Sequence, residues 1–190
     1  MRPGKFLGVT LVSMSLIAVA ASAQEPQESA IPWGWLSDLV GAWAGEETGR
    51  AGTGRGERRY EMILGERYVF ADNVSRFDPQ EQNPRGETHG DWAIFSYDQA
   101  REKLILREFH SEGYVIEYVA EGESGHGAPL IFVSERVENA PAGTRARYSL
   151  TPQSDGSFVE KFEVAFPGQE LQTFLENRWR RVKTREGRGG

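Results

Sequence analysis

The stretch LVGAWAG, residues 39–45, decides how the rest of the chain is interpreted, because it sets one tryptophan, Trp43, among small residues. The preceding segment PWGWLSDLV, residues 32–40, predicts one or two helical turns entered at Pro32. The residues that follow alternate in the manner of a β-strand. Trp43 is therefore either an ordinary core aromatic or a plug that closes one end of a barrel, and we favour the plug.

The chain after Gly41 consists of short apolar or alternating runs separated by turn signals such as LGE, YDQARE, HSEG and PQSDGS. No helix of useful length is predicted among them. These patterns predict ten strands, near residues 42–49, 56–64, 67–76, 88–97, 103–110, 114–121, 129–137, 143–151, 157–166 and 170–182. Ten consecutive strands joined by short turns predict an all-β fold, a single antiparallel up-and-down barrel, because closure removes the exposed sheet edges.

The N-terminal segment has the pattern of a secretory signal peptide. Arg2 and Lys5 precede an apolar run over residues 6–21, and the small-x-small motif ASA predicts cleavage after Ala23. An uncleaved membrane anchor is the alternative, but the run is short for a bilayer span. We expect a signal peptide over residues 1–23, a disordered leader over 24–32, a barrel over 33–184 and a flexible tail over 185–190. The mature protein is then periplasmic or secreted, with no membrane span.

Composition and charge narrow the function classes. The chain has no cysteine, which excludes disulfides, thiol nucleophiles and thiolate metal sites. Its formal net charge is −6, and removal of Arg2 and Lys5 with the signal peptide leaves −8. Such a surface disfavours nucleic acid. The one basic run, residues 178–188, is interpreted as a solvated tail, with weak anion binding as the alternative.

The motifs LVGAWAGEETG and LENRWRRV, at the two ends of the predicted barrel, resemble the calycin pattern. That pattern has a G-x-W on the first strand and an arginine on the last strand that packs across the tryptophan. More narrowly, FSYDQAREKLILREFHSEGYVIEY resembles secreted bacterial proteins with a lipocalin-like or fatty-acid-binding-protein-like barrel, related in shape to nitrobindin. The resemblance implies that Trp43 is the plug. It implies that Arg178, Arg180 or Arg181 covers it, of which we favour Arg178 and Arg180.

Turn lengths predict which side chains share a face. With residues 111–113 as a turn, Arg107 pairs with Glu117, whereas a two-residue turn would oppose Glu108 to Glu117. With residues 98–101 as a loop, Asp91 pairs with Glu108 and Trp92 lies beside Arg107. Asp91, Glu108 and Ile116 then share one face of the sheet, and Trp92, Arg107 and Glu117 share the other. A one-residue change in either turn would exchange the two faces.

We expect the face that contains Asp91, Glu108 and Ile116 to line the interior, with polar groups gathered at one end, as in a small-molecule site. The predicted ligand-binding residues are His89, Asp91, Ala93, Phe95, Leu106, Glu108, His110, Tyr114, Ile116 and Tyr118. Further lining is expected from Tyr60, Met62, Tyr68, Phe70, Phe158, Phe162, Val164 and Phe166. The alternative is that these aromatics fill the core and the polar end is a solvated rim.

We expect no resident cofactor, and two alternatives stay open. His89, Asp91, Glu108 and His110 offer imidazoles and carboxylates that can bind a divalent metal. The nitrobindin resemblance implies a haem-ligating histidine near the end of the chain, but TFLENRWRRVKT, residues 173–184, has none. Haem would therefore have to use His110, since His126 lies in a predicted loop.

The sequence favours a binding protein over an enzyme. It has no G-x-S-x-G, no H-E-x-x-H and no phosphate-binding glycine loop, and GTGRG at residues 52–56 is interpreted as a flexible loop. The predicted function is a carrier or sensor for a small apolar or amphipathic molecule. The alternatives are an isomerase-like or cyclase-like barrel using His110 with Glu108, and a filled barrel that associates with a protein or with itself through a face containing Trp92.

Overall fold

The computed structural model describes residues 31–122 and 127–183. The predicted signal peptide, the predicted leader up to residue 30, the predicted tail and His126 lie outside the described residues. A short 3₁₀ helix, η1 (Gly34–Leu39), precedes ten strands. The strands are β1 (Gly41–Gly49), β2 (Gly52–Ile63), β3 (Tyr68–Phe77), β4 (Glu87–Asp98), β5 (Lys103–His110), β6 (Val115–Glu121), β7 (Leu130–Glu138), β8 (Arg145–Pro152), β9 (Phe158–Ala165) and β10 (Gln172–Arg181).

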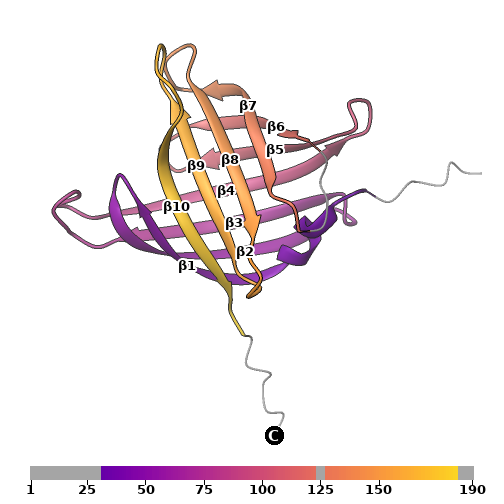
Figure 1. Cartoon of the computed structure of the whole chain (residues 1–190), viewed down its shortest axis with the longest axis horizontal. Coiled ribbons are helices and arrows are strands. Elements are labelled where there is room, and N and C mark those ends of the chain that lie inside the picture. Colours follow the sequence, from indigo (N-terminus) through magenta and orange to yellow (C-terminus); the bar gives the residue numbers. More distant parts are fainter. Residues whose placement is uncertain (1–30, 123–126, 184–190) are drawn as a thin grey trace, which may run out of the picture. The chain divides into compact units, whose positions relative to one another are not determined.

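The strands form one closed antiparallel barrel in which each strand pairs with its sequence neighbours and β1 pairs with β10 (Figure 1). The predicted all-β up-and-down barrel is therefore confirmed. Because consecutive strands alternate in direction, the connections β1–β2, β3–β4, β5–β6, β7–β8 and β9–β10 lie together at one end of the barrel. In the described part of the chain no helix is both long enough and apolar enough to cross a membrane.

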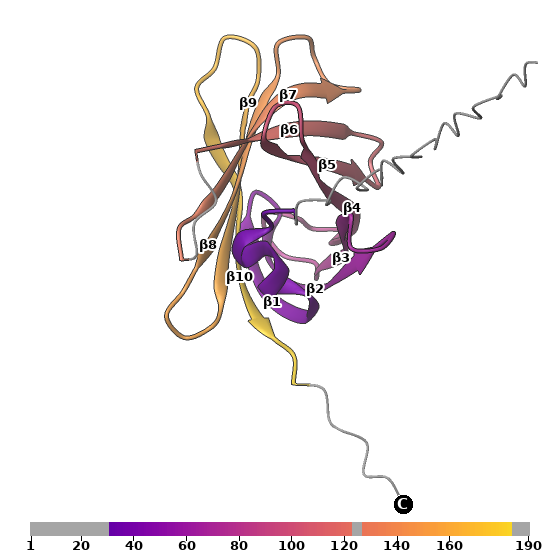
Figure 2. The same ribbon diagram turned by 90° about the vertical axis from the view of Figure 1, so that its right-hand side faces the viewer.

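The packed core lies toward the end at which η1 joins β1. Trp35, Leu36 and Leu39 of η1 are buried in the same cluster as Trp43, and Figure 2 shows η1 beside β1. The aromatic ring of Phe158 meets Trp43 edge-on, with ring centroids 4.8 Å apart. Ile31, in the predicted leader, packs against this cluster rather than standing apart from it.

Glycines in β1 and β2 make room for a tryptophan from β10. Gly45 pairs with Trp179 on one side and with Gly56 on the other. A Cβ on Gly45 would come within 2.7 Å of the Trp179 ring, and one on Gly56 would overlap Trp179 and the Glu47 carboxylate. The GTGRG segment is therefore part of β2, and its interpretation as a loop was wrong. Gly54 and Gly56 of this segment lie where a Cβ would overlap Phe77 and Trp179, large side chains from other strands.

The β5–β6 register is the predicted one, with Arg107 opposite Glu117 and Glu108 opposite Ile116. The β4–β5 register was wrong by two residues, because Asp91 pairs with His110 rather than with Glu108. The Asp98 carboxylate accepts hydrogen bonds from the backbone N–H groups of residues 100 and 101, which moves the loop to residues 99–102. A shift of two leaves each side chain on its predicted face, because strand side chains alternate with a period of two.

Candidate functional site

The half of the barrel away from η1 contains a cavity of about 370 Å³. Its wall includes residues from four of the five connections at that end, such as Ala51, Glu112, Pro141 and Phe166, and the strand residues Phe77 and Glu87 that flank the fifth. The apolar part of the wall comprises Phe77, Ile116, Val137, Ala146, Phe162, Val164, Phe166, Phe174 and Leu175. The cavity is therefore open at one end of the barrel and lined near that opening mainly by aliphatic and aromatic side chains, with Arg50, Glu87 and Glu112 among them.

The predicted ligand-binding residues divide between this cavity and the core. Six line the cavity, namely His89, Asp91, Glu108, His110, Tyr114 and Ile116. Four do not, and their assignment to a ligand site is corrected: Ala93, Phe95, Leu106 and Tyr118 are buried in the packed core. They lie farther along β4, β5 and β6 toward η1, where Phe132, Leu150 and Tyr148 fill the barrel.

The predicted supporting residues also divide. Phe162, Val164 and Phe166 line the cavity, whereas Tyr60, Met62 and Phe158 belong to or pack against the core. Tyr68 and Phe70 were wrongly placed inside. On β3 the inward positions belong to Val69 and Ala71, and Phe70 packs instead against the exposed ring of Trp92, with centroids 5.9 Å apart.

The inner end of the cavity, here called the floor, consists chiefly of Glu47, Arg58, Asn73, Glu160 and Asn177. A buried ion pair forms its centre. Arg58 of β2 and Glu160 of β9 have side chains only 5% and 4% exposed, and the guanidinium binds both carboxylate oxygens. Arg58 also donates to Asn73 Oδ1 at 3.2 Å and to the hydroxyl oxygen of Tyr148 at 3.1 Å. Its guanidinium lies 4.5 Å from the centroid of the Trp179 ring, an arrangement that favours cation–π attraction. The one buried arginine of this floor is thus saturated by protein groups among the described residues.

A chain of hydrogen bonds extends the floor from the ion pair toward β4 and β1. Asn73 Nδ2 donates to Asp91 Oδ2 at 2.7 Å and to Ser75 Oγ at 3.1 Å, and Ser75 Oγ donates to Glu47 Oε1 at 2.7 Å. Burial raises the pKa of Glu47 to about 7. The Glu47 carboxyl is therefore partly protonated at neutral pH and can donate as well as accept a hydrogen bond.

Glu108 is a second carboxyl that burial keeps protonated. Its pKa is raised to about 8 by burial and by the nearby charge of Asp91. The Tyr118 hydroxyl donates to Glu108 Oε2 at 2.7 Å. His110 Nε2 lies 3.8 Å from the same oxygen, which is beyond hydrogen-bond distance, and burial lowers the pKa of His110. The predicted acid–base pair of Glu108 and His110 is therefore not connected by a hydrogen bond.

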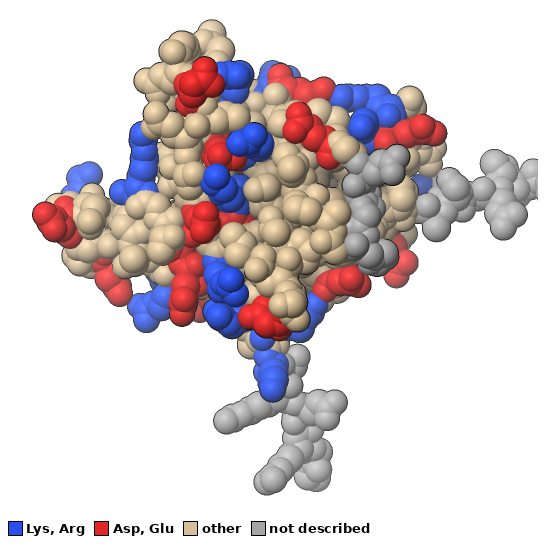
Figure 3. Space-filling view, viewed as in Figure 1, with Lys and Arg blue, Asp and Glu red and all other residues tan. Residues whose placement is uncertain are grey.

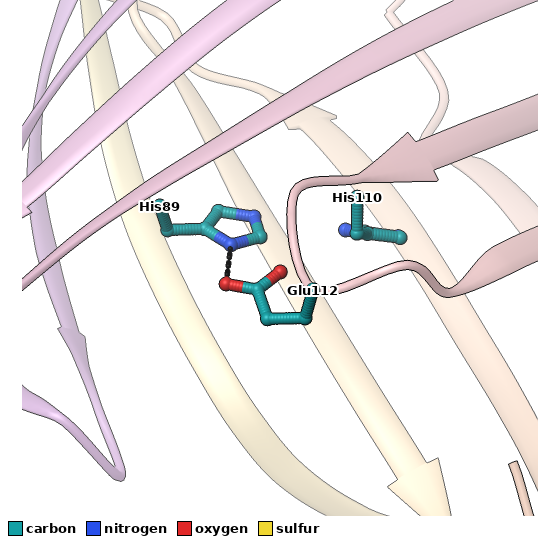
Figure 4. Close-up of side chains that lie close together, drawn as sticks. All are labelled: His89, His110 and Glu112. Atoms are coloured by element: carbon teal, nitrogen blue, oxygen red, sulfur yellow. Dashed lines mark hydrogen bonds and ion pairs between the residues drawn. The ribbon is translucent and has the colours of Figure 1, made fainter. Parts of the chain in front are cut away.

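His89 of β4 lies between two carboxylates at the edge of the cavity. Its Nδ1 is 2.8 Å from Glu112 Oε1 and its Nε2 is 3.3 Å from Asp91 Oδ2. Burial opposes the charged imidazolium, but the contacts with Asp91 and Glu112 outweigh burial and raise the pKa of His89 to about 9. Burial likewise opposes the charge of Asp91, yet its contact with His89 and the charge of Arg58 lower its pKa. Figure 4 shows His89 and Glu112 facing each other, with His110 beside them.

Three buried polar atoms on the cavity wall have no hydrogen-bond partner within the described residues: Glu47 Oε2, His110 Nε2 and Asn177 Oδ1. Native interiors satisfy nearly all buried polar atoms, so each such atom needs an explanation. All three atoms belong to residues that line the same cavity. A polar group of a ligand that enters through the open end can therefore reach these residues.

Trp43 is covered by Arg181, not by Arg178 or Arg180. The Arg181 guanidinium lies 4.5 Å from the Trp43 ring centroid and donates to the carbonyl oxygens of Val40 and Asp38. The β1–β10 register pairs Trp43 directly with Arg181, which explains the choice. Arg178 instead donates to Ser157 Oγ at 3.2 Å, and Arg180 is exposed beside Ala44. The Trp43 indole N–H donates to the carbonyl oxygen of Leu39 at 2.6 Å.

The outer surface over β8, β9 and β10 carries side chains of both charges, interspersed as Figure 3 shows. Glu163, for example, accepts from Arg147 at 2.6 Å and lies 3.1 Å from Lys161. On β4, Trp92 is 57% exposed and donates to Asp72 Oδ1 at 2.9 Å. The predicted homo-oligomer through a Trp92 face remains a prediction.

Several floor residues were not foreseen from the sequence, chiefly Glu47, Arg58, Asn73, Glu160 and Asn177. A signal for them exists in the strand alternation. Arg58 lies two residues before buried Tyr60, and Glu160 lies two residues after buried Phe158. Polar residues at inward positions of otherwise apolar faces would have indicated a polar floor.

These features define the molecule as a closed antiparallel barrel that is filled at one end and hollow, with a polar floor, at the other. No protein-family model matches the chain. No curated protein matches it either. Among solved structures, it is similar to that titled "Crystal Structure of Rv2717c from M. tuberculosis", with a TM-score of 0.58 and 17% identity over 81% of this chain and 99% of that chain. At this identity the similarity shows the barrel fold alone.

Proposed function

We propose that this protein is a calycin-like carrier or sensor that binds a small amphipathic molecule inside the barrel and performs no chemistry on it. The observation that carries the proposal is the cavity of about 370 Å³, whose wall is apolar near the opening and holds unpartnered buried polar atoms. Its volume lies in the range of ordinary small-molecule sites. We further propose that the mature chain, cleaved after Ala23, acts in the periplasm or outside the cell.

The apolar end of the ligand is expected to lie near the opening. Phe162 and Phe174 meet there edge-on, with ring centroids 5.8 Å apart, and Val137, Val164 and Leu175 complete an apolar collar. Burying apolar ligand surface against these side chains supplies roughly 25 cal/mol per Å². Because apolar contacts with the collar are not directional, the polar groups of the floor determine which molecules bind.

The polar end of the ligand is expected to be uncharged or cationic and to carry a hydrogen-bond donor. Asn177 Oδ1 can only accept, and Glu47 Oε2 accepts when ionised. Arg58, the buried cation of the floor, is already occupied by Glu160. Glu87, Asp91 and Glu112 add negative charge to the wall, which the cations His89 and Arg50 offset only in part. A carboxylate or sulfonate on the ligand would therefore be repelled and would find no free cation at the floor.

Two fluorescent probes with the same aromatic frame test this proposal. N-phenyl-1-naphthylamine is uncharged and carries an N–H donor, whereas 1-anilinonaphthalene-8-sulfonate adds a sulfonate to that frame. We expect the first to bind with enhanced fluorescence and the second to bind at least about tenfold more weakly, a difference of about 1.4 kcal/mol. Equal binding of both probes would contradict the proposed polarity, and binding of neither would contradict the interior site itself.

A matched pair of substitutions on β9 locates the binding. Val164 faces the cavity and Val159 faces outward on the same strand. Val164→Trp should fill part of the cavity and reduce affinity for N-phenyl-1-naphthylamine at least about tenfold. Val159→Trp adds the same side chain outside and should leave the affinity unchanged. Equal affinities of the two variants would place the probe elsewhere on the protein.

A further inference from the structure

We propose that His89, His110 and Glu112 form a binding site for a divalent transition-metal ion at the edge of the cavity. The site is independent of the amphipathic ligand proposed above, although it shares the same cavity wall. Its residues come from β4, from the last position of β5 and from the β5–β6 turn. One ligand atom from each lies within 4.8 Å of the other two.

The side chains converge from three directions on one point. His89 Nδ1 and Glu112 Oε1 are 2.8 Å apart, and the two imidazole rings lie 5.6 Å apart between centroids. In Figure 4 a ring nitrogen of His110 is turned toward the space beside His89 and Glu112. His110 Nε2 is buried and has no hydrogen-bond partner within the described residues. His110 therefore has a ring nitrogen that no described residue occupies, and its ring lies beside the His89–Glu112 pair.

The surroundings of His89 match those of a metal-ligating histidine. Such a histidine usually donates its second ring N–H to a carboxylate, which fixes the tautomer and the ring orientation. His89 Nε2 lies 3.3 Å from Asp91 Oδ2, and Asn73 holds the same oxygen at 2.7 Å. Nδ1 is then the nitrogen that faces Glu112, and it gives up its proton when the proposed ion binds. Asp91 is a positioning residue in this arrangement, not a ligand.

The remaining geometry can adjust to metal–ligand distances. Bonds of about 2.0–2.2 Å in a tetrahedral site place neighbouring ligand atoms roughly 3.2–3.6 Å apart. Glu112 must therefore move slightly away from His89, and His110 must approach. Glu112 is well placed to move, because it lies on an exposed turn next to Gly113, whose φ of 90° only glycine adopts readily.

The donor set selects the kind of ion. Two imidazole nitrogens and one carboxylate suit Zn²⁺, Fe²⁺, Co²⁺ or Mn²⁺, whereas Ca²⁺ and Mg²⁺ prefer oxygen ligands throughout. With three protein ligands, a tetrahedral ion keeps a fourth position open to water or another small ligand. The sequence had suggested Glu108 for such a site. The two-residue shift between β4 and β5 removes Glu108, which Tyr118 already binds, and Glu112 takes its place.

The test uses residues 24–190 produced without an affinity tag, stripped with a chelator and titrated with ZnCl₂ by calorimetry. We expect a single ion per chain with micromolar or tighter affinity, and a visible ligand-field band when Co²⁺ is added instead. Glu112→Gln and His110→Gln should each weaken binding at least about tenfold. Asp91→Asn should weaken it by a similar factor while keeping the shape of the Co²⁺ band.

The matched control is Glu87→Gln, which removes one negative charge from the same cavity wall outside the cluster. This variant should bind Zn²⁺ like the unsubstituted chain. Glu112 is on an exposed turn, so Glu112→Gln is expected to fold and keeps the test decisive if His110→Gln does not. Absence of stoichiometric uptake would overturn the proposal. Uptake that is unchanged in Glu112→Gln and His110→Gln would also overturn it, by placing the ion elsewhere. Both results leave the probe-binding experiment unaffected.

Discussion

Replacing Arg58 by methionine should be the most damaging single change to the cavity floor. The substitution keeps much of the side-chain volume but removes the charge that compensates Glu160, whose side chain is 4% exposed. It also leaves Asn73 Oδ1 and the Tyr148 hydroxyl without their donor. Breaking one partner of a buried pair costs about 3–5 kcal/mol, because the other charge stays buried and uncompensated. We expect the free energy of unfolding at pH 7 to fall by about 4 kcal/mol.

The assay is urea unfolding of the single variants Arg58→Met and Glu160→Gln and of the double variant, followed by tryptophan fluorescence. If the ion pair organises the floor, the double variant should be more stable than the sum of the single losses predicts, by about 2 kcal/mol or more. A loss below about 1 kcal/mol, or additive single losses, would refute this account of the floor.

Three further predictions concern the floor and the plug. Glu47→Gln should flatten the pH dependence of stability. Because burial raises the pKa of Glu47 to about 7, its protonated carboxyl favours the folded state below pH 4.5. This contribution, about 3 kcal/mol at most, is lost as the pH rises through 7. Thermal unfolding at pH 4.5 and pH 8.5 should therefore show Glu47→Gln more stable than the unsubstituted chain only at the higher pH, and the same difference at both would contradict it. Gly56→Ala should lower the melting temperature by several degrees, because its Cβ overlaps Trp179, whereas Gly65→Ala meets no atom within 4 Å and should show only the smaller cost of its φ of 66°. Arg181→Met should lower the free energy of unfolding in urea by about 1–2 kcal/mol, because the contact with Trp43 is lost. The control Arg180→Met, at an exposed position, should change it by nearly zero. Equal losses in the two variants would show that stacking of Arg181 on Trp43 does not stabilise the fold.

The strands were predictable because turn residues and alternation are local signals. Nine of the ten strands begin and end within two residues of their predicted bounds, and β2 begins four residues earlier than predicted. The β5–β6 register followed from one unfavourable pairing, Glu108 against Glu117. The β4–β5 register failed because Asp98 hydrogen-bonds to its own loop, which the pattern of side chains does not reveal. The face survived that error only because the shift was an even number of residues.

The candidate site was predictable only in part, because its boundary is set by how the interior is filled. Phe95 and Tyr118 share a face with His89 and Ile116, yet the first two are core and the others line the cavity. Which end is filled depends on η1 and on side chains from distant strands, such as Phe132. Aromatic size also misled the placement of Phe70, because the inward positions on either side of it hold the smaller residues Val69 and Ala71.

The choice of Arg181 over Arg178 and Arg180 required the β1–β10 register. The barrel closes through the pairing of β1 with β10, two strands that lie near opposite ends of the described chain. Three arginines within four positions look equivalent in sequence, and only the partner of Trp43 can stack on it. Glu112 was overlooked for a related reason, since a turn residue acquires a role only when the strands on both sides fix where the turn points.

The measurement that tests the central claim most directly is native mass spectrometry of the untagged mature chain with N-phenyl-1-naphthylamine added. The account predicts a complex of one probe with one chain, which is lost in Val164→Trp and retained in Val159→Trp. The sulfonated probe should give little or no such complex. A bare polypeptide mass in every sample would show that the barrel holds no accessible binding cavity, and the claim of an interior ligand site would then be wrong.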